Sequence, residues 1–109
     1  MITDGFVMKE VKTFIDNLDP HGNHLYWIGL TAEQNEGDFV WSSTNESVTF
    51  TNWNEGEPNN NRGHENCVHL ELGRLNRRWN DRQCNSSFLF ALCQKGYLSL
   101  IVHLSLEVQ

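Results

Sequence analysis

The stretch EPNNNRGHENC, residues 57–67, decides how this chain is organised, because it combines two carboxylates and four amide side chains with almost no apolar content. Asn, Gly and Pro favour turns, so the stretch is predicted to form a loop. Glu57, Asn59 and Glu65 also carry the oxygen atoms that a hard cation binds. The stretch is therefore either an ordinary turn or an ion-binding loop, and the surrounding sequence distinguishes the two.

The whole chain has the size and composition of one small globular domain. It has 109 residues, of which 39% are hydrophobic and 20% are charged, which is typical of a folded protein. The net charge of −6 argues against nucleic-acid binding, because phosphate recognition needs a basic face. No apolar run approaches the roughly 20 residues of a membrane span. Four arginines lie among acidic residues and are expected on a solvated face: Arg74, Arg77, Arg78 and Arg82.

Hydrophobic periodicity on both sides of the loop predicts an α+β domain. Apolar side chains recur at helical spacing over residues 4–18, with Thr3 or Asp4 as the cap, and predict one amphipathic helix. The segment CVHLEL, residues 67–72, alternates apolar and polar residues and predicts a half-buried strand. Further strands are expected in short apolar or β-prone segments, namely HLYWIGLT (24–31), DFVWSS (38–43), VTFTNW (48–53) and FLFALCQ (88–94).

The C-terminal segment is strongly strand-like, because apolar residues from Leu98 to Leu106 recur at every second position. An unpaired strand of this kind is prone to aggregation, so we expect it to pair within the chain or with a second copy. The alternative is a disordered tail whose alternation arose by chance. The predicted organisation is a folded domain over residues 1–96 and a strand-like extension over residues 97–109.

Four short motifs occur in a fixed order, and their combination is specific although each one alone is common. They are WIGL at 27–30, EPN at 57–59, ENC at 65–67 and WND at 79–81. In this order the chain resembles the C-type lectin-like domain over roughly residues 4–95. The resemblance implies an α+β fold in which a helix packs on antiparallel sheets and the WIGL strand lies in the core beneath a long calcium-binding loop region.

The resemblance also implies one Ca2+ site, where the EPN and WND segments meet around an ion that binds sugar as well. Its side-chain ligands would be the carboxylates of Glu57, Glu65 and Asp81 and the amide carbonyls of Asn59 and Asn80. The backbone carbonyl of Asp81 would be a further ligand. Such a set suits Ca2+, which takes 6–8 oxygen ligands. The same five side chains would hydrogen-bond the sugar.

The triplet Glu57-Pro58-Asn59 also indicates the class of sugar. Pro58 resembles a cis-proline of the family, which turns the flanking side chains towards one point. In the family the order Glu-Pro-Asn, as opposed to Gln-Pro-Asp, is associated with sugars that bear equatorial 3- and 4-hydroxyls. Mannose, N-acetylglucosamine, glucose and fucose belong to that class, whereas galactose is the predicted non-ligand. No residue spacing suggests a nucleophile or a zinc centre, so the chain is expected not to be an enzyme.

Many members of the family hold a second calcium, and here the chain departs from the pattern. Ala32, Asn60 and Asn66 stand where acidic residues commonly lie. Only Glu36 and Glu65 remain as matching carboxylates. Because so little negative charge is left, the second site is predicted to be lost or very weak.

A larger departure lies at the start of the chain, where the first strand and first helix of the family are missing before residue 4. A disulfide between Cys67 and Cys84 is still implied. The family partner of Cys93 would lie in the missing helix, so Cys93 is expected to be a buried free thiol or part of an intermolecular bridge. The C-terminal extension is predicted to take the place of the missing strand.

These features predict a lectin that binds mannose-, N-acetylglucosamine- or fucose-type sugars through Ca2+ and recognises glycans or microbial surfaces in innate immunity. The alternative is a lectin-like module that binds protein and no sugar. Cysteine use and the sequons at Asn45 and Asn85 favour a secreted protein, although MITDGFVMKE shows no signal peptide. The expected partners are glycans, and a homodimer could form through the tail or Cys93.

Overall fold

Helix α1 (Gly5–Leu18) begins at Asp4, whose Oδ1 accepts a hydrogen bond from the backbone N–H of Val7 at 2.9 Å. This side chain satisfies one of the free N–H groups of the first turn, as an N-cap does. The helix buries Met8, Val11 and Ile15 against the sheet. The prediction of a helix over residues 4–18 is therefore confirmed.

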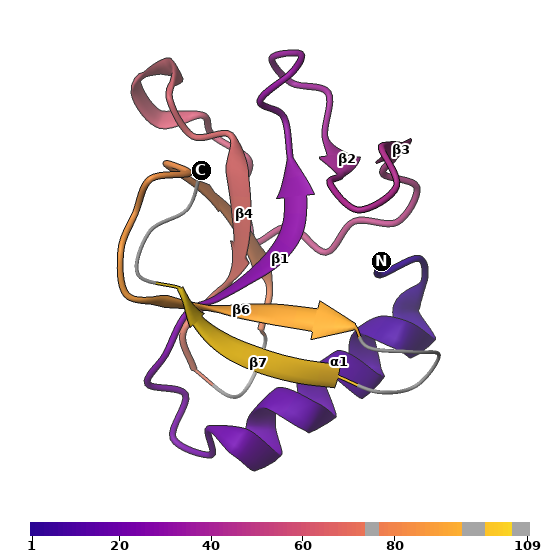
Figure 1. Cartoon of the computed structure of the whole chain (residues 1–109), viewed down its shortest axis with the longest axis vertical. Coiled ribbons are helices and arrows are strands. Elements are labelled where there is room, and N and C mark those ends of the chain that lie inside the picture. The colour runs from indigo at the N-terminus through magenta and orange to yellow at the C-terminus, as the bar shows by residue number, and fades with distance from the viewer. Residues whose placement is uncertain (74–76, 95–99, 106–109) are drawn as a thin grey trace.

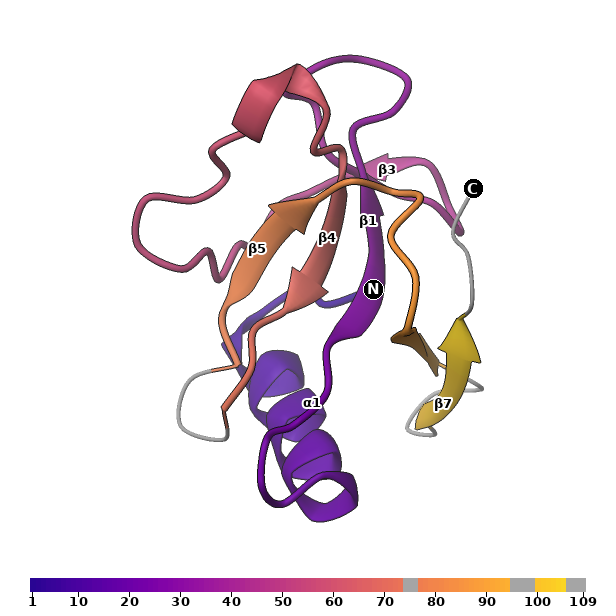
Figure 2. The ribbon, with the colours of Figure 1, turned by 90° about the vertical axis from the view of Figure 1, so that its left-hand side faces the viewer.

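The computed structural model describes residues 1–73, 77–94 and 100–105. The strands that the structure describes are β1 (Tyr26–Thr31), β2 (Val40–Trp41), β3 (Glu46–Ser47), β4 (Cys67–Leu70), β5 (Trp79–Arg82), β6 (Leu89–Gln94) and β7 (Leu100–Ser105). They form one sheet with the core order β3-β2-β1-β4-β5. Most pairs are antiparallel, but β1 pairs with β6 in parallel, with Tyr26 opposite Phe90. Helix α1 and the long loop before β4 lie at opposite ends of the molecule (Figures 1 and 2).

Trp79 is the centre of the core and is fully buried. Its ring makes edge-on contacts with the rings of Trp41, Phe50 and Trp53, at centroid distances of 5.8–6.1 Å. Its Nε1–H donates to Met8 Sδ at 3.4 Å, which ties the sheet to α1. The residue that opens the WND motif therefore serves packing, and it fixes the position of the two residues that follow it.

Two strand predictions differ from the structure. The segment VTFTNW forms only an isolated bridge, in which Trp53 pairs with Trp79. In CVHLEL, strand β4 covers four residues that are all buried, including His69, whereas Leu72 is 57% exposed. The expected half-buried alternation is wrong because β4 lies between β1 and β5 and both of its faces are covered.

Arg77 contradicts the prediction of a solvated arginine face, because its side chain is fully buried at the end of α1. Its Nε donates to Asp16 Oδ1 at 3.2 Å, and an Nη donates to the backbone carbonyl of Asp19 at 3.1 Å. The guanidinium also lies 5.8 Å from the centre of the Tyr26 ring. Arg78 is exposed, Arg82 is half-buried, and Arg74 lies outside the described residues.

Strand β7 pairs antiparallel with β6, from Leu89 opposite Ser105 to Gln94 opposite Leu100. The expectation that the C-terminal segment pairs within the chain is thus confirmed for residues 100–105. The predicted boundary at residues 96 and 97, together with Leu98 and Leu106, lies outside the described residues. Figure 1 shows β6 and β7 side by side, crossing the lower part of β1.

The cysteine predictions also have outcomes in the structure. Cys67 and Cys84 form a disulfide, as expected. Cys93 is a free, half-buried cysteine on β6. A bridge to a second chain stays a prediction.

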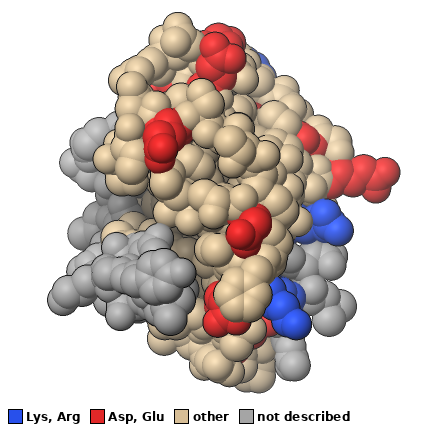
Figure 3. All heavy atoms as spheres, turned by 90° about the vertical axis from the view of Figure 1, so that its right-hand side faces the viewer, with Lys and Arg blue, Asp and Glu red and all other residues tan. Residues whose placement is uncertain are grey.

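The surface and the helix bear on possible partners. On the face shown in Figure 3, acidic side chains are scattered, and the visible Lys and Arg side chains lie at the margins, most of them along the right-hand edge. Among the residues that the structure describes, no helix has the length and apolar character needed to cross a bilayer.

Candidate functional site

The loop between Trp53 and β4 is anchored at both ends to the sheet. At its start, the N–H of Asn54 donates to the carbonyl of Trp79 at 2.8 Å. At its end, the carbonyl of Asn66 accepts from the N–H of Ala32 at 2.8 Å. The Glu57–Pro58 bond is cis, as predicted. Because both ends are fixed, the polar residues between them are held above the carboxyl end of β1 and the end of β5.

Asp81 lies at the centre of this loop region and is only 2% exposed. Its Oδ1 accepts from the N–H of Asn59 at 3.1 Å, and its Oδ2 accepts from the N–H of Asn60 at 2.6 Å. Strand β5 positions Asp81, because Trp79 two residues earlier is locked in the core. The WND segment and the EPN segment therefore meet through direct hydrogen bonds.

Glu57 and Glu65 approach the same region from the two ends of the loop. Glu57 Oε1 accepts from the N–H of Asn59 at 3.1 Å, and Glu65 Oε1 accepts from the N–H of Asn61 at 3.1 Å. Burial raises the pKa of Glu57, and the neighbouring Asp81 and Glu65 carboxylates raise it further, against the opposing hydrogen bond from Asn59. Three acidic groups are therefore close enough to repel one another.

The two predicted amide ligands differ in their surroundings. Asn59 is exposed, and its Oδ1 accepts from the N–H of Asn61 at 3.2 Å. Asn80 is half-buried, and its Nδ2 donates to Glu71 Oε2 at 3.1 Å. Glu71 also accepts from Asn54 Nδ2 at 3.4 Å. Because Glu71 fixes the amide of Asn80, it is a positioning residue, and nothing in its sequence context distinguished it from a solvent-facing strand residue.

The structure thus brings Glu57, Asn59 and Asp81 into direct hydrogen-bonded contact through the loop backbone. Glu65 joins them through Asn60, whose Oδ1 accepts from the N–H of Glu65 at 3.1 Å. The amide of Asn60 also donates to the carboxylate of Glu36, so this carboxylate is engaged by a neutral partner. That the second calcium site is lost or very weak stays a prediction. Asn80 follows directly before Asp81 on β5.

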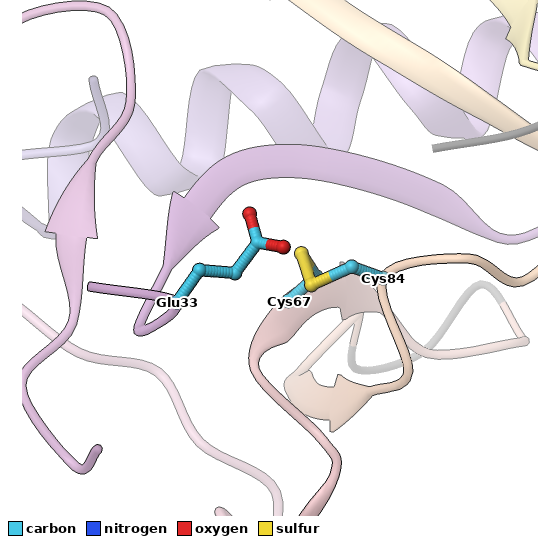
Figure 4. A group of neighbouring side chains, drawn as sticks. All are labelled: Glu33, Cys67 and Cys84. Carbon is cyan, nitrogen blue, oxygen red and sulfur yellow. A yellow bond between two sulfur atoms is a disulfide. The ribbon is translucent and has the colours of Figure 1, made fainter. Parts of the chain in front are cut away.

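A second group of potential metal ligands lies at the disulfide, and its chemistry rules out a metal site. Among the described residues, the possible ligand atoms of Glu33, Cys67 and Cys84 lie within 4.8 Å of one another. The carboxylates of Glu57, Glu65 and Asp81 do not lie so close together. Figure 4 shows the carboxylate of Glu33 directed at the Cys67–Cys84 sulfur atoms. Those sulfur atoms are joined in a disulfide and offer no thiolate, so this group is not a metal site.

A polar hollow of about 330 Å³ adjoins the loop on the side of β5. Burial lowers the pKa of His69 in its wall, against the opposing effect of its contact with the carbonyl of Leu70. That contact joins His69 Nδ1 to the carbonyl oxygen at 2.9 Å, so Nδ1 carries the proton. The hollow shares three residues with the predicted calcium site, and its lining is Glu65, His69, Asn80, Asp81, Arg82, Gln83 and Ser86.

Comparison with known proteins agrees with this geometry. The chain matches the family model of the lectin C-type domain over residues 4–95. Salivary C-type lectin 2 of Aedes albopictus is 39% identical over 78 residues, which are 69% of this chain and 51% of that protein. The chain spans about half the length of the curated relatives it matches.

Solved structures show the same fold. The EPNH mutant of CEL-I, a C-type lectin from Cucumaria echinata, has a TM-score of 0.70 and 28% identity, covering 79% of this chain and 59% of that one. The cow C-type carbohydrate-recognition domain of CD23, solved in the presence of a GlcNAc2Man3 oligosaccharide, has a TM-score of 0.53 and 33% identity, covering 70% and 54%.

The relatives are lectins and not enzymes, so the expectation of a non-catalytic protein is confirmed by the family. The family model spans helix α1, the core strands and the segment from EPN to WND. On the strength of that match and of the shared fold, this chain belongs to the C-type lectin domain family.

Proposed function

We propose that this chain binds mannose-type sugars through one calcium ion held by Glu57, Asn59, Glu65, Asn80 and Asp81. One observation carries the proposal: the carboxylates of Glu57, Glu65 and Asp81 gather in one loop region, and no ion pair among the described residues involves them. Members of the family generally bind Ca2+. A divalent cation would relieve the mutual repulsion of the three acids.

The donor set fits calcium in kind and in number. Three carboxylates and two amide carbonyls are hard oxygen donors, and the flexible geometry of Ca2+ tolerates ligands from separate segments. Each carboxylate now accepts from loop N–H groups, so ion binding exchanges some of these hydrogen bonds for coordination. Glu71 holds one N–H of the Asn80 amide, which leaves its carbonyl oxygen for the ion.

The sugar would be held by the same side chains. Bound Ca2+ supplies coordination positions for two neighbouring hydroxyls. Each hydroxyl then donates to the carboxylate of Glu57 or Glu65 and accepts from the amide of Asn59 or Asn80, and hydrogen bonds to charged acceptors are the stronger kind. Asn80 keeps a second N–H for this purpose, because only one is used by Glu71.

One structural neighbour supports a mannose-type preference. The CD23 domain was solved in the presence of an oligosaccharide that contains mannose and N-acetylglucosamine. A single exposed site binds a monosaccharide weakly, so recognition of microbial or host glycans would depend on several sites acting together. The disulfide fits an extracellular location.

The test is a glycan array run with calcium and with a chelator, using the protein and two variants. Asp81→Asn should abolish binding to mannose-type sugars, because it removes a ligand charge at the centre of the site. Glu55→Gln is the matched control, since Glu55 is an exposed acid of the same loop outside the proposed ligand set. Binding that resists the chelator would overturn the proposal. A folded protein that binds no sugar would favour the alternative of a protein-binding module.

A further inference from the structure

The polar hollow beside β5 contains a charged group that the calcium site does not use. Glu65, Asn80 and Asp81 belong to both, whereas Arg82, Gln83 and Ser86 lie only in the hollow. The hollow has a volume of about 330 Å³. It is therefore an open, polar extension of the proposed sugar site along the strand that carries the WND motif.

Arg82 is the cationic side chain of this hollow. Among the described residues it makes no ion pair and no side-chain hydrogen bond, whereas Arg77 nearby in sequence donates from Nε to Asp16 and from one Nη to the carbonyl of Asp19. Residues at i and i+2 of a strand point to the same side, so Arg82 follows Asn80 on one face of β5, about 7 Å further along. From that position the guanidinium can reach the part of a ligand that adjoins the part bound by Asn80.

The neighbours of Arg82 complete a polar cradle. The amide of Gln83 is exposed and makes no hydrogen bond among the described residues. Ser86 Oγ donates to the carbonyl of Gln83 at 2.8 Å, so its free lone pairs can only accept. His69 donates its Nδ1 proton to a backbone carbonyl, which leaves Arg82 as the side chain that brings positive charge to the lining.

We propose that this hollow is a subsite for a second sugar residue that carries an anionic group, either a carboxylate or a sulfate. The guanidinium of Arg82 and the amide of Gln83 bind the anion, and Ser86 Oγ accepts from a hydroxyl of the same sugar. The planar fork of arginine matches both anions with two parallel hydrogen bonds. This inference rests on the proposed function, because the first sugar places the second.

The experiment compares three immobilised ligands at constant ionic strength: mannose, a neutral disaccharide with a terminal mannose, and the same disaccharide with a carboxylate or a sulfate on its second residue. All proteins carry Ser87→Ala, which removes the sequon at Asn85 so that no glycan covers the hollow. The variants are Arg82→Gln, which keeps length and polarity, and Arg82→Lys, which keeps the charge.

The parent protein should bind an anionic disaccharide about fivefold more tightly than the neutral one, as expected for a partly exposed ion pair of good geometry. Arg82→Gln should lose this preference and keep its affinity for mannose, whereas Arg82→Lys should keep part of it. The carboxylate and sulfate arms identify the anion that the subsite takes.

Equal binding of the neutral disaccharide and both anionic ones would overturn the inference, as would a preference that survives in Arg82→Gln. If the parent protein showed no calcium-dependent binding of mannose, the proposed function would be overturned instead. Mannose binding without an anion preference overturns only the subsite, so the two failures are distinguishable.

Discussion

Asp19, the residue after α1, should be the most costly acidic side chain to remove from this protein, although it lies far from the loop that is proposed to bind calcium. It is only 6% exposed and accepts three hydrogen bonds. Its Oδ1 accepts from the N–H of Asn23 at 3.1 Å, and its Oδ2 accepts from the N–H of His24 at 3.0 Å and from the hydroxyl of Tyr26 at 3.1 Å. The guanidinium of Arg77 lies 3.9 Å away.

The expected magnitude follows from these contacts. A hydrogen bond to a charged group contributes about 1.5–3 kcal/mol, and water can replace only part of this for the two backbone groups. The hydroxyl of the buried Tyr26 and the charge of Arg77 lose a partner outright. We therefore expect Asp19→Ala to lower the unfolding free energy by about 3–5 kcal/mol, a large part of the total for a small domain.

Urea unfolding followed by tryptophan fluorescence measures this change, and Asp4→Ala is the matched control. It removes the same carboxylate chemistry at the other end of α1, where one N-cap bond is worth about 1 kcal/mol. Burial and the hydrogen bond to Asp19 raise the pKa of Tyr26 to about 12, so ultraviolet titration of Asp19→Ala should show a lower value. If Asp19→Ala cost no more than Asp4→Ala, the structural role assigned to Asp19 would be refuted.

Three further predictions concern the disulfide, the acidic loop and pH. Replacing Cys67 and Cys84 with alanine should cost about 3 kcal/mol in urea unfolding, from the chain entropy of a 17-residue separation, and an unchanged midpoint would contradict this. Glu57→Gln should raise the melting temperature of the calcium-free protein, because it relieves the repulsion that helps to raise the pKa of Glu57. The same change should abolish the increase in melting temperature that added calcium is expected to cause. A calcium-free variant that melts at a lower temperature than the parent protein would count against this reasoning. Asp16 and Asp19 have lowered pKa values, so their contribution is present above the ordinary value of 3.8 and is lost as pH falls below it. Acid unfolding should therefore be less steep in Asp19→Ala, and identical steepness would argue against the linkage.

The parts of the fold that could be predicted depend on local patterns. The helix at residues 5–18 is recognisable from its apolar spacing and its capping aspartate, and strand β1 from an apolar run between turn residues. The proposed site also has a local signature, because its residues come from three motifs of three residues each. Motif order identifies the family even though the five ligands stay a prediction.

The parts that were mispredicted depend on contacts between distant segments. Arg77 has acidic sequence neighbours like a surface residue, yet Asp16 and Asp19 are brought to it from 58–61 residues away. His69 sits in an alternating strand, but coverage of both faces of β4 buries it. Glu71 becomes a positioning residue only because β5 places Asn80 beside it. No single-sequence pattern contains these pairings.

The two clusters of acidic residues in this domain have opposite physical characters, and their separation explains how both can exist in one small protein. At the end of α1, burial acts to raise the pKa values of Asp16 and Asp19, but hydrogen bonds lower both overall, so the two carboxylates stabilise the fold. The donors are Lys12 and Arg77 for Asp16, and the N–H groups of Asn23 and His24 with the hydroxyl of Tyr26 for Asp19. In the loop at the other end of the molecule, burial raises the pKa of Glu57, and the nearby carboxylates of Asp81 and Glu65 raise it further.

A cluster of like charges persists only where other interactions over-determine the backbone that carries it. Here Trp79 locks the start of β5 in the core, the Cys67–Cys84 disulfide joins β4 to the segment after β5, and Asn54 and Asn66 anchor the loop ends. The carboxylates are therefore held near one another at a cost in calcium-free stability. A cation bound at the proposed site would turn that cost into binding free energy, so stability and calcium affinity should change in opposite directions when Glu57 is neutralised.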